Sequence, residues 1–144
     1  AVFYLMNSSE QNTVFTAGQK EKSIQLQDGT GIQLAAHSNL ELAPGYGKKN
    51  RSLTLKGSGY FSVKHSKKLP FIIDAGPIHI KDLGTKFNVE TGDDTIFVRV
   101  DEGIVVIYDN KGMKLTLKAN ESAHYVISSG DLRLDVLAEN LKKQ

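Results

Sequence analysis

Short runs in which apolar and polar residues alternate recur along almost the whole chain. Examples are Ile24-Gln25-Leu26, Ile32-Gln33-Leu34, Leu53-Thr54-Leu55, Ile78-His79-Ile80 and Leu115-Thr116-Leu117. A period of two places one face of a β-strand in a core and the other in water. Turn sequences such as Gln27-Asp28-Gly29 and Asp109-Asn110-Lys111-Gly112 separate these runs. The pattern predicts about a dozen or more short strands.

A helical stripe of apolar residues is found only near the C-terminus. It comprises Leu134, Leu137, Ala138 and Leu141, and the following Lys142-Lys143 suits a helix C-terminus. Evenly spaced strands without intervening helices favour an all-β fold over βαβ units. We therefore expect stacked short strands that form either a β-helix-like (solenoid-like) core or a jelly-roll or sandwich core, with a short C-terminal helix. Periodicity alone does not choose between these cores.

The composition sets limits on what the chain can do. With 144 residues, 40% hydrophobic and 24% charged, it is the size and composition of one globular domain. It has no cysteine, which excludes disulfides, cysteine-based zinc sites and thiol catalysis. A net charge of +2 is too small to indicate nucleic-acid binding.

The charges are unevenly distributed. Residues 43–73 contain no Asp or Glu but several basic residues. This segment is either an ordinary solvated face or a docking surface for an acidic partner or lipid headgroups. The candidate docking residues are Lys48, Lys49, Arg51, Lys64, Lys67 and Lys68.

Residues arranged for enzymatic turnover are hard to find. The four histidines, at positions 37, 65, 79 and 124, lack the spacings that bring two imidazoles to one metal ion. Ser58 lies between glycines but not in a GxSxG elbow. The two glycine-rich segments, Gly29-Thr30-Gly31 and Gly57-Ser58-Gly59, lack the following Lys-Ser/Thr of a phosphate loop. We expect no enzymatic turnover, no metal and no cofactor, and a metal-dependent jelly-roll enzyme is disfavoured.

Seven short motifs follow one another in a characteristic order. They are Leu26-Gln27-Asp28-Gly29-Thr30, the segments 34–40 and 51–63, Pro70-Phe71-Ile72-Ile73, the segments 83–89 and 100–106, and Ala119-Asn120-Glu121-Ser122-Ala123. Together they resemble the FecR family of membrane-anchored anti-sigma regulators over roughly residues 16–123. One departure is visible, because Ser58, Gly59 and Ser62 occupy a strand that carries two acids in the family.

The resemblance implies a signal relay on the periplasmic side of the inner membrane. The protein would be a single-pass inner-membrane protein, with a cytoplasmic segment that binds a sigma factor and a periplasmic domain that faces the signalling domain of an outer-membrane TonB-dependent receptor. We expect residues 1–12 to be membrane-proximal, 13–130 to form the FecR-like β domain, and 131–144 to be a linker or the start of a further subdomain. The apolar segment 1–6 would end the membrane helix. A carbohydrate- or cell-surface-binding β module is the alternative.

The resemblance also singles out Gly84 and Thr85, because some members of the family cut themselves at the Gly-Thr bond of this motif. The Thr85 hydroxyl is a nucleophile beside the Gly84 carbonyl, and its attack would exchange the peptide bond for an ester that water hydrolyses. In the simpler alternative, Gly84 makes a tight turn before a strand and Thr85 bonds to local backbone.

Overall fold

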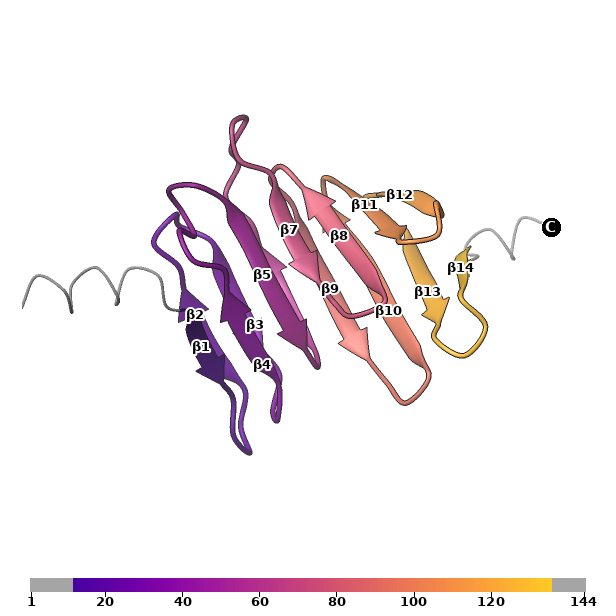
Figure 1. Ribbon diagram of the computed structural model, residues 1–144, viewed down its shortest axis with the longest axis horizontal. Helices are drawn as coiled ribbons and strands as arrows, with labels where there is room; N and C mark the ends of the chain where they lie inside the picture. The colour runs from indigo at the N-terminus through magenta and orange to yellow at the C-terminus, as the bar shows by residue number, and fades with distance from the viewer. Residues whose placement is uncertain (1–11, 136–144) are drawn as a thin grey trace, which may run out of the picture.

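The computed structural model describes residues 12–135, and within that range the secondary-structure elements are all β-strands joined by turns and loops. In the described residues fourteen strands pack as two facing sheets, so the expected all-β class and the sandwich-like core are confirmed (Figure 1). The expected C-terminal helix falls mostly on residues 136–144, outside the described part, and Leu134 belongs to a strand. Of the expected membrane-proximal segment 1–12, residues 1–11 also lie outside the described part.

Each sheet contains seven strands within residues 12–135. Sheet A contains, in spatial order, β1 (Thr13–Thr16), β4 (Asn39–Leu42), β5 (Arg51–Lys56), β7 (Phe71–Asp74), β8 (Ile78–Asp82), β11 (Ile104–Asp109) and β12 (Lys114–Lys118). Sheet B contains β2 (Lys22–Gln25), β3 (Gly31–Leu34), β6 (Gly59–Ser62), β9 (Lys86–Thr91), β10 (Thr95–Glu102), β13 (Ser122–Val126) and β14 (Asp131–Leu134). Because β14 pairs with β13, sheet B continues past the domain boundary expected at residue 130.

The strand order in both sheets follows the order of the sequence. The chain adds one or two strands to one sheet, crosses to the other, and advances along the sandwich from β1 and β2 to β12 and β14 (Figure 1). This steady advance gives the sandwich a solenoid-like character. Of the described strand pairs, only β5 and β7 are parallel, because β6 lies between them in sequence but in the opposite sheet.

A cluster of phenylalanines holds the two sheets together at the centre. Phe61 and Phe87 are partners in the β6–β9 register, and their rings stack with centroids 5.3 Å apart. Phe71 reaches them from sheet A, with its ring 6.1 Å from that of Phe61. All three side chains are fully buried, and burial of aromatic rings provides a large share of core stability.

Candidate functional site

Arg51 lies at one end of the sandwich and connects three loops. It is the first residue of β5, and its side chain is only 2% exposed. Its guanidinium donates hydrogen bonds to the backbone oxygens of Leu69 (2.7 Å), Lys64 (2.6 Å) and Leu83 (3.4 Å). It also forms an ion pair with Asp28, with Nη1 and Oδ2 3.2 Å apart. The planar guanidinium suits this role because its donors point in several fixed directions.

The expectation that Arg51 docks an external partner is therefore wrong. Its charge is buried and is compensated by Asp28, which lies outside the acid-free segment in sequence. The Asp28 carboxylate is itself fixed in position by hydrogen bonds. It accepts them from the backbone N–H of Thr30 (3.1 Å), the hydroxyl of Thr30 (2.9 Å) and the hydroxyl of Tyr46 (3.3 Å). Burial, reinforced by the Asp28 charge, raises the pKa of Tyr46, so this phenol stays protonated.

The five candidate lysines are exposed and belong to two loops at the same end of sheet A. Lys48 and Lys49 lie in the loop before β5, and the others, Lys64, Lys67 and Lys68, lie in the loop before β7. Because β5 and β7 are parallel, with Arg51 opposite Phe71, the two loops lie side by side. The structure thus brings these lysines together at one end of sheet A.

Gly84 and Thr85 form a tightly packed turn beside the same loops, in which Gly84 is half-buried and Thr85 is buried. Thr85 is 5% exposed, and its hydroxyl donates a 2.7 Å hydrogen bond to Oδ2 of Asp82, which is 4% exposed. Gly84 has no room for a side chain, because a Cβ there would lie 2.7 Å from Cα of His65. Gly103, at φ +88°, packs against the other side of the turn, where an added Cβ would lie 3.0 Å from the Gly84 oxygen.

Asp82 is the residue of this turn that the sequence analysis missed. Burial raises its pKa to about 6, and the Thr85 hydrogen bond and the Arg51 charge oppose that rise. Its Oδ1 is buried without a hydrogen-bond partner among the described residues. A carboxylate in this position is able to accept the proton of the Thr85 hydroxyl. The available signal was its place in the sequence, because Asp82 follows Ile78 and Ile80 on the inward side of β8.

A second cluster contains serine, histidine and aspartate but is not arranged for nucleophilic catalysis. The Ser122 hydroxyl and the His124 Nδ1 both contact the carboxylate of Asp135, at 2.8 and 2.7 Å. In a catalytic triad the histidine lies between the other two residues and accepts the serine proton. Here the serine and histidine share one carboxylate, which connects β13 to the end of β14.

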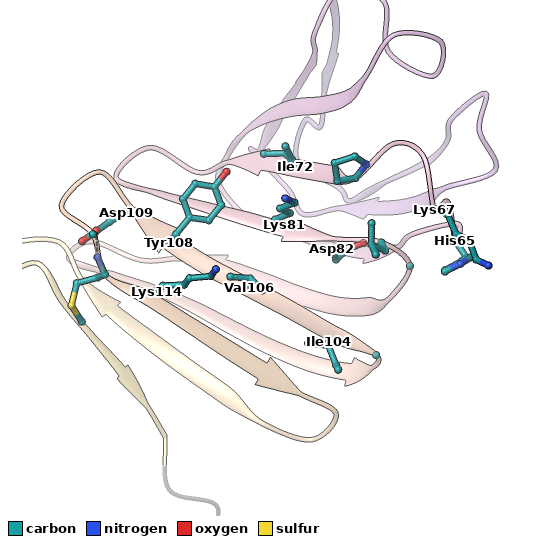
Figure 2. Close-up of a pocket in the computed structure, with 16 residues that line it drawn as sticks. His65, Lys67, Ile72, Lys81, Asp82, Ile104, Val106, Tyr108, Asp109 and Lys114 are labelled. Carbon is teal, nitrogen blue, oxygen red and sulfur yellow. Dashed lines mark hydrogen bonds between the residues drawn. The ribbon is translucent and has the colours of Figure 1, made fainter.

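The outer face of sheet A carries a groove of about 1080 Å³ (Figure 2). It extends from His65 and Asp82 at one end to Asp109 at the other, and Gly84 and Met113 also line it. Within residues 12–135 there is no cluster of three metal-ligating side chains. That same segment contains no helix long and apolar enough to cross a membrane.

Comparison with known proteins places the chain in a family. The family model described as FecR protein matches residues 12–106, well over half of the 144 residues. The chain therefore belongs to the FecR family. No curated protein matches it.

Two crystal structures share the fold. Both are of a candidate anti-sigma factor from Parabacteroides distasonis ATCC 8503. One is 23% identical with a TM-score of 0.80, and the match covers 87% of this chain and 60% of that one. The other is 24% identical with a TM-score of 0.79, and the match covers 85% of this chain and 59% of that one. The chain thus spans about 60% of the length of these neighbours.

Proposed function

We propose that this chain is the periplasmic signal-relay domain of a membrane-anchored anti-sigma regulator. In this role it couples an outer-membrane TonB-dependent transducer to an extracytoplasmic-function sigma factor. The observation that carries the proposal is the FecR family match over residues 12–106. The similarity in fold to candidate anti-sigma factors supports it.

The geometry at the loop end fits a scaffold for binding. Arg51 uses its donors to hold loops in place, and the shared family motifs around Asp28 and Leu83 supply its partners. The sigma factor and the inner membrane would be reached through a cytoplasmic segment and a single membrane helix. The receptor's signalling domain would meet the folded domain in the periplasm, and no nucleic acid is involved.

The five exposed lysines beside the loop end are the proposed docking surface for an acidic region of that partner or for lipid headgroups. Steering by exposed charge weakens with salt, because the Debye length falls from about 10 Å at 0.1 M to about 3 Å at 1 M. We expect replacement of Lys48, Lys49, Lys67 and Lys68 by Glu to weaken binding at low salt. Lys20→Glu with Lys22→Glu is the matched control, because these lysines lie at or before β2 in sheet B.

The test uses the full-length protein in its own cells, with a sigma-dependent reporter gene and the soluble N-terminal domain of a neighbouring TonB-dependent receptor. We expect that domain to co-purify with the regulator, and the reporter to lose its response to the inducer when the lysines are reversed. Alkaline phosphatase fused after Gln144 reports the compartment, since it is active only outside the cytoplasm. Glycan-array binding without receptor binding would contradict the proposal and favour the carbohydrate-binding alternative.

We also propose a single self-cleavage event at the Gly84–Thr85 bond, favoured by the 2.7 Å contact between the Thr85 hydroxyl and Asp82. In the first step the hydroxyl oxygen bonds to the Gly84 carbonyl carbon and the peptide C–N bond breaks. The hydroxyl proton passes to the Asp82 carboxylate and then to the departing Thr85 nitrogen. Water then hydrolyses the ester, which leaves a carboxylate on Gly84 and a free amine and hydroxyl on Thr85.

Mass spectrometry of the denatured protein after long incubation tests this reaction. We expect fragments that end at Gly84 and begin at Thr85, and we expect them to persist in Thr85→Ser and vanish in Thr85→Ala. Asp82→Asn should slow cleavage, whereas Asp109→Asn, another buried aspartate, is the control that leaves it unchanged. An intact wild-type chain under all conditions would reduce the turn to a structural role.

A further inference from the structure

The groove on sheet A differs from the neighbouring strands of that sheet because several of its outward positions are apolar. Outward residues of the neighbouring strands β4 and β5 are polar, as at Glu41, Ser52 and Thr54. In the groove, by contrast, Ile72 of β7 and Val106 of β11 face outward. Further apolar side chains are strongly exposed at its two ends, namely Ile104 at 54%, Leu83 at 46% and Met113 at 45%. A concave apolar surface of this kind marks an interaction site.

Among the charged side chains that line the groove, the lysines are exposed and the aspartates are buried. Lys81 lies between Ile72 and Val106 in the strand register, and Lys67 and Lys114 lie at the margins (Figure 2). Within the described part of the chain, no carboxylate lies within ion-pair distance of these three lysines.

Both carboxylates that line the groove are turned into the protein. Asp82 accepts the hydrogen bond of Thr85, and Asp109 accepts hydrogen bonds from the backbone of Lys111 and Met113, each 2.9 Å long. They are 4% and 8% exposed. The groove therefore offers an incoming molecule apolar side chains together with positive charge, from Lys81 within the floor and from Lys67 and Lys114 at the margins.

We propose that this groove binds an acidic peptide segment of a partner protein, one that combines Asp or Glu with aliphatic or aromatic side chains. Apolar side chains of the segment fill the floor beside Ile72, Val106 and Ile104, and its carboxylates meet Lys81 and Lys114. A concave groove fits side chains better than it fits the flat surface of a membrane. A second copy is disfavoured because two such faces would bring like charges together. The assignment does not depend on which receptor the regulator serves.

A random dodecapeptide phage library, selected on the immobilised 144-residue chain, tests the proposal. We expect selected peptides to combine acidic with aliphatic or aromatic residues, and their binding, measured by fluorescence anisotropy, to weaken as salt rises. Ile104→Lys, and separately Lys81→Glu with Lys114→Glu, should each weaken binding by about tenfold or more.

Matched controls separate the groove from general surface effects. Val14→Lys introduces the same charge at an apolar residue of β1 that is 57% exposed and lies outside the groove. Lys20→Glu with Lys22→Glu repeats the charge reversal outside the groove. These controls should leave affinity unchanged, and thermal melts should show every variant folded.

Three outcomes would overturn the proposal. The first is an absence of selected peptides, or peptides that bind all variants equally. The second is binding of phosphatidylglycerol vesicles that the groove variants abolish, which would assign the face to lipid. The third is dimerisation seen by sedimentation and lost in Ile104→Lys, which would assign the face to a second copy. Failure of receptor co-purification alone would overturn only the relay function.

Discussion

Burial of Asp82 makes the folding stability depend on pH, and this dependence can be measured directly. Burial raises its pKa to about 6 from an ordinary value of 3.8, against the opposing effects of Thr85 and Arg51. A carboxyl with a higher pKa in the folded chain than in the unfolded chain holds its proton more tightly when folded, so protonation stabilises the fold. Its contribution is complete below about pH 4 and is lost as the pH rises through about 6.

The size of the effect follows from the same values. The difference between about 6 and 3.8 corresponds to about 3 kcal/mol, at about 1.4 kcal/mol per pKa unit. The contacts explain the cost, because the ionised carboxylate receives one hydrogen bond from Thr85 while Oδ1 has no partner in the described chain. Asparagine keeps an oxygen for Thr85 and carries no charge. Asp82→Asn should therefore match wild type at about pH 4 and exceed it by up to about 3 kcal/mol at about pH 8.

Urea unfolding followed by far-UV circular dichroism, repeated across this pH range, measures the difference in unfolding free energy between wild type and Asp82→Asn. The control is Asp93→Asn, because Asp93 is an exposed loop residue that lacks the buried surroundings of Asp82. A wild-type minus Asp82→Asn difference that does not change with pH would refute the reasoning. So would a difference that favours wild type at the alkaline end.

Three further substitutions test the packing around this turn and the core. Arg51→Met leaves Asp28 and several carbonyl groups without their buried donor, and urea titration should show a loss of about 3–5 kcal/mol, whereas an unchanged midpoint would contradict its bridging role. Gly103→Ala should lower the free energy of unfolding more than Gly112→Ala. Both glycines have positive φ, but only a Cβ at position 103 would meet Thr85, 2.5 Å from its Cγ2. Equal losses would show that backbone strain alone matters. Phe61→Ala should lose about 3–5 kcal/mol in the same assay, and a smaller loss would mean that the core collapses around the missing ring.

The strands could be predicted from the sequence, but their partners could not. Alternation marks β3 and β8 equally well, although they lie in opposite sheets. The parallel pairing of β5 with β7 depends on the chain crossing to sheet B and back, which no local pattern records. The all-β class follows from local preference, while the two-sheet advance is set by contacts between residues far apart in sequence.

The two errors at the loop end have one cause. Charge along the sequence carries no information on burial, so Arg51 resembles the exposed lysines although its partner Asp28 lies 23 residues earlier. Asp82 was passed over because a single aspartate at the end of an apolar run resembles ordinary turn chemistry. Desolvation is decided by which loops meet in space, and that information is not local.

The groove left a signal that could have been used. Phe71-Ile72-Ile73 and Ile104-Val105-Val106-Ile107 break the alternation, so both faces of these strands are apolar. A strand of a two-layer sandwich needs only one apolar face for the core. An apolar outer face is then either covered by another segment or available to bind a partner. In the described chain no strand or loop covers Ile104, which is 54% exposed.

Alternation along β8 also brings the two candidate sites into contact. Lys81 and Leu83 point outward and line the groove, while Asp82 between them points inward and holds the Thr85 hydroxyl. A segment bound in the groove therefore touches the residues on either side of the carboxylate. Binding that shifts this strand end must change the free energy of the Asp82–Thr85 contact, and by reciprocity a change at that contact must alter the affinity of the groove. Coupling of an outside partner to the Gly84–Thr85 bond therefore requires that binding displace this strand end.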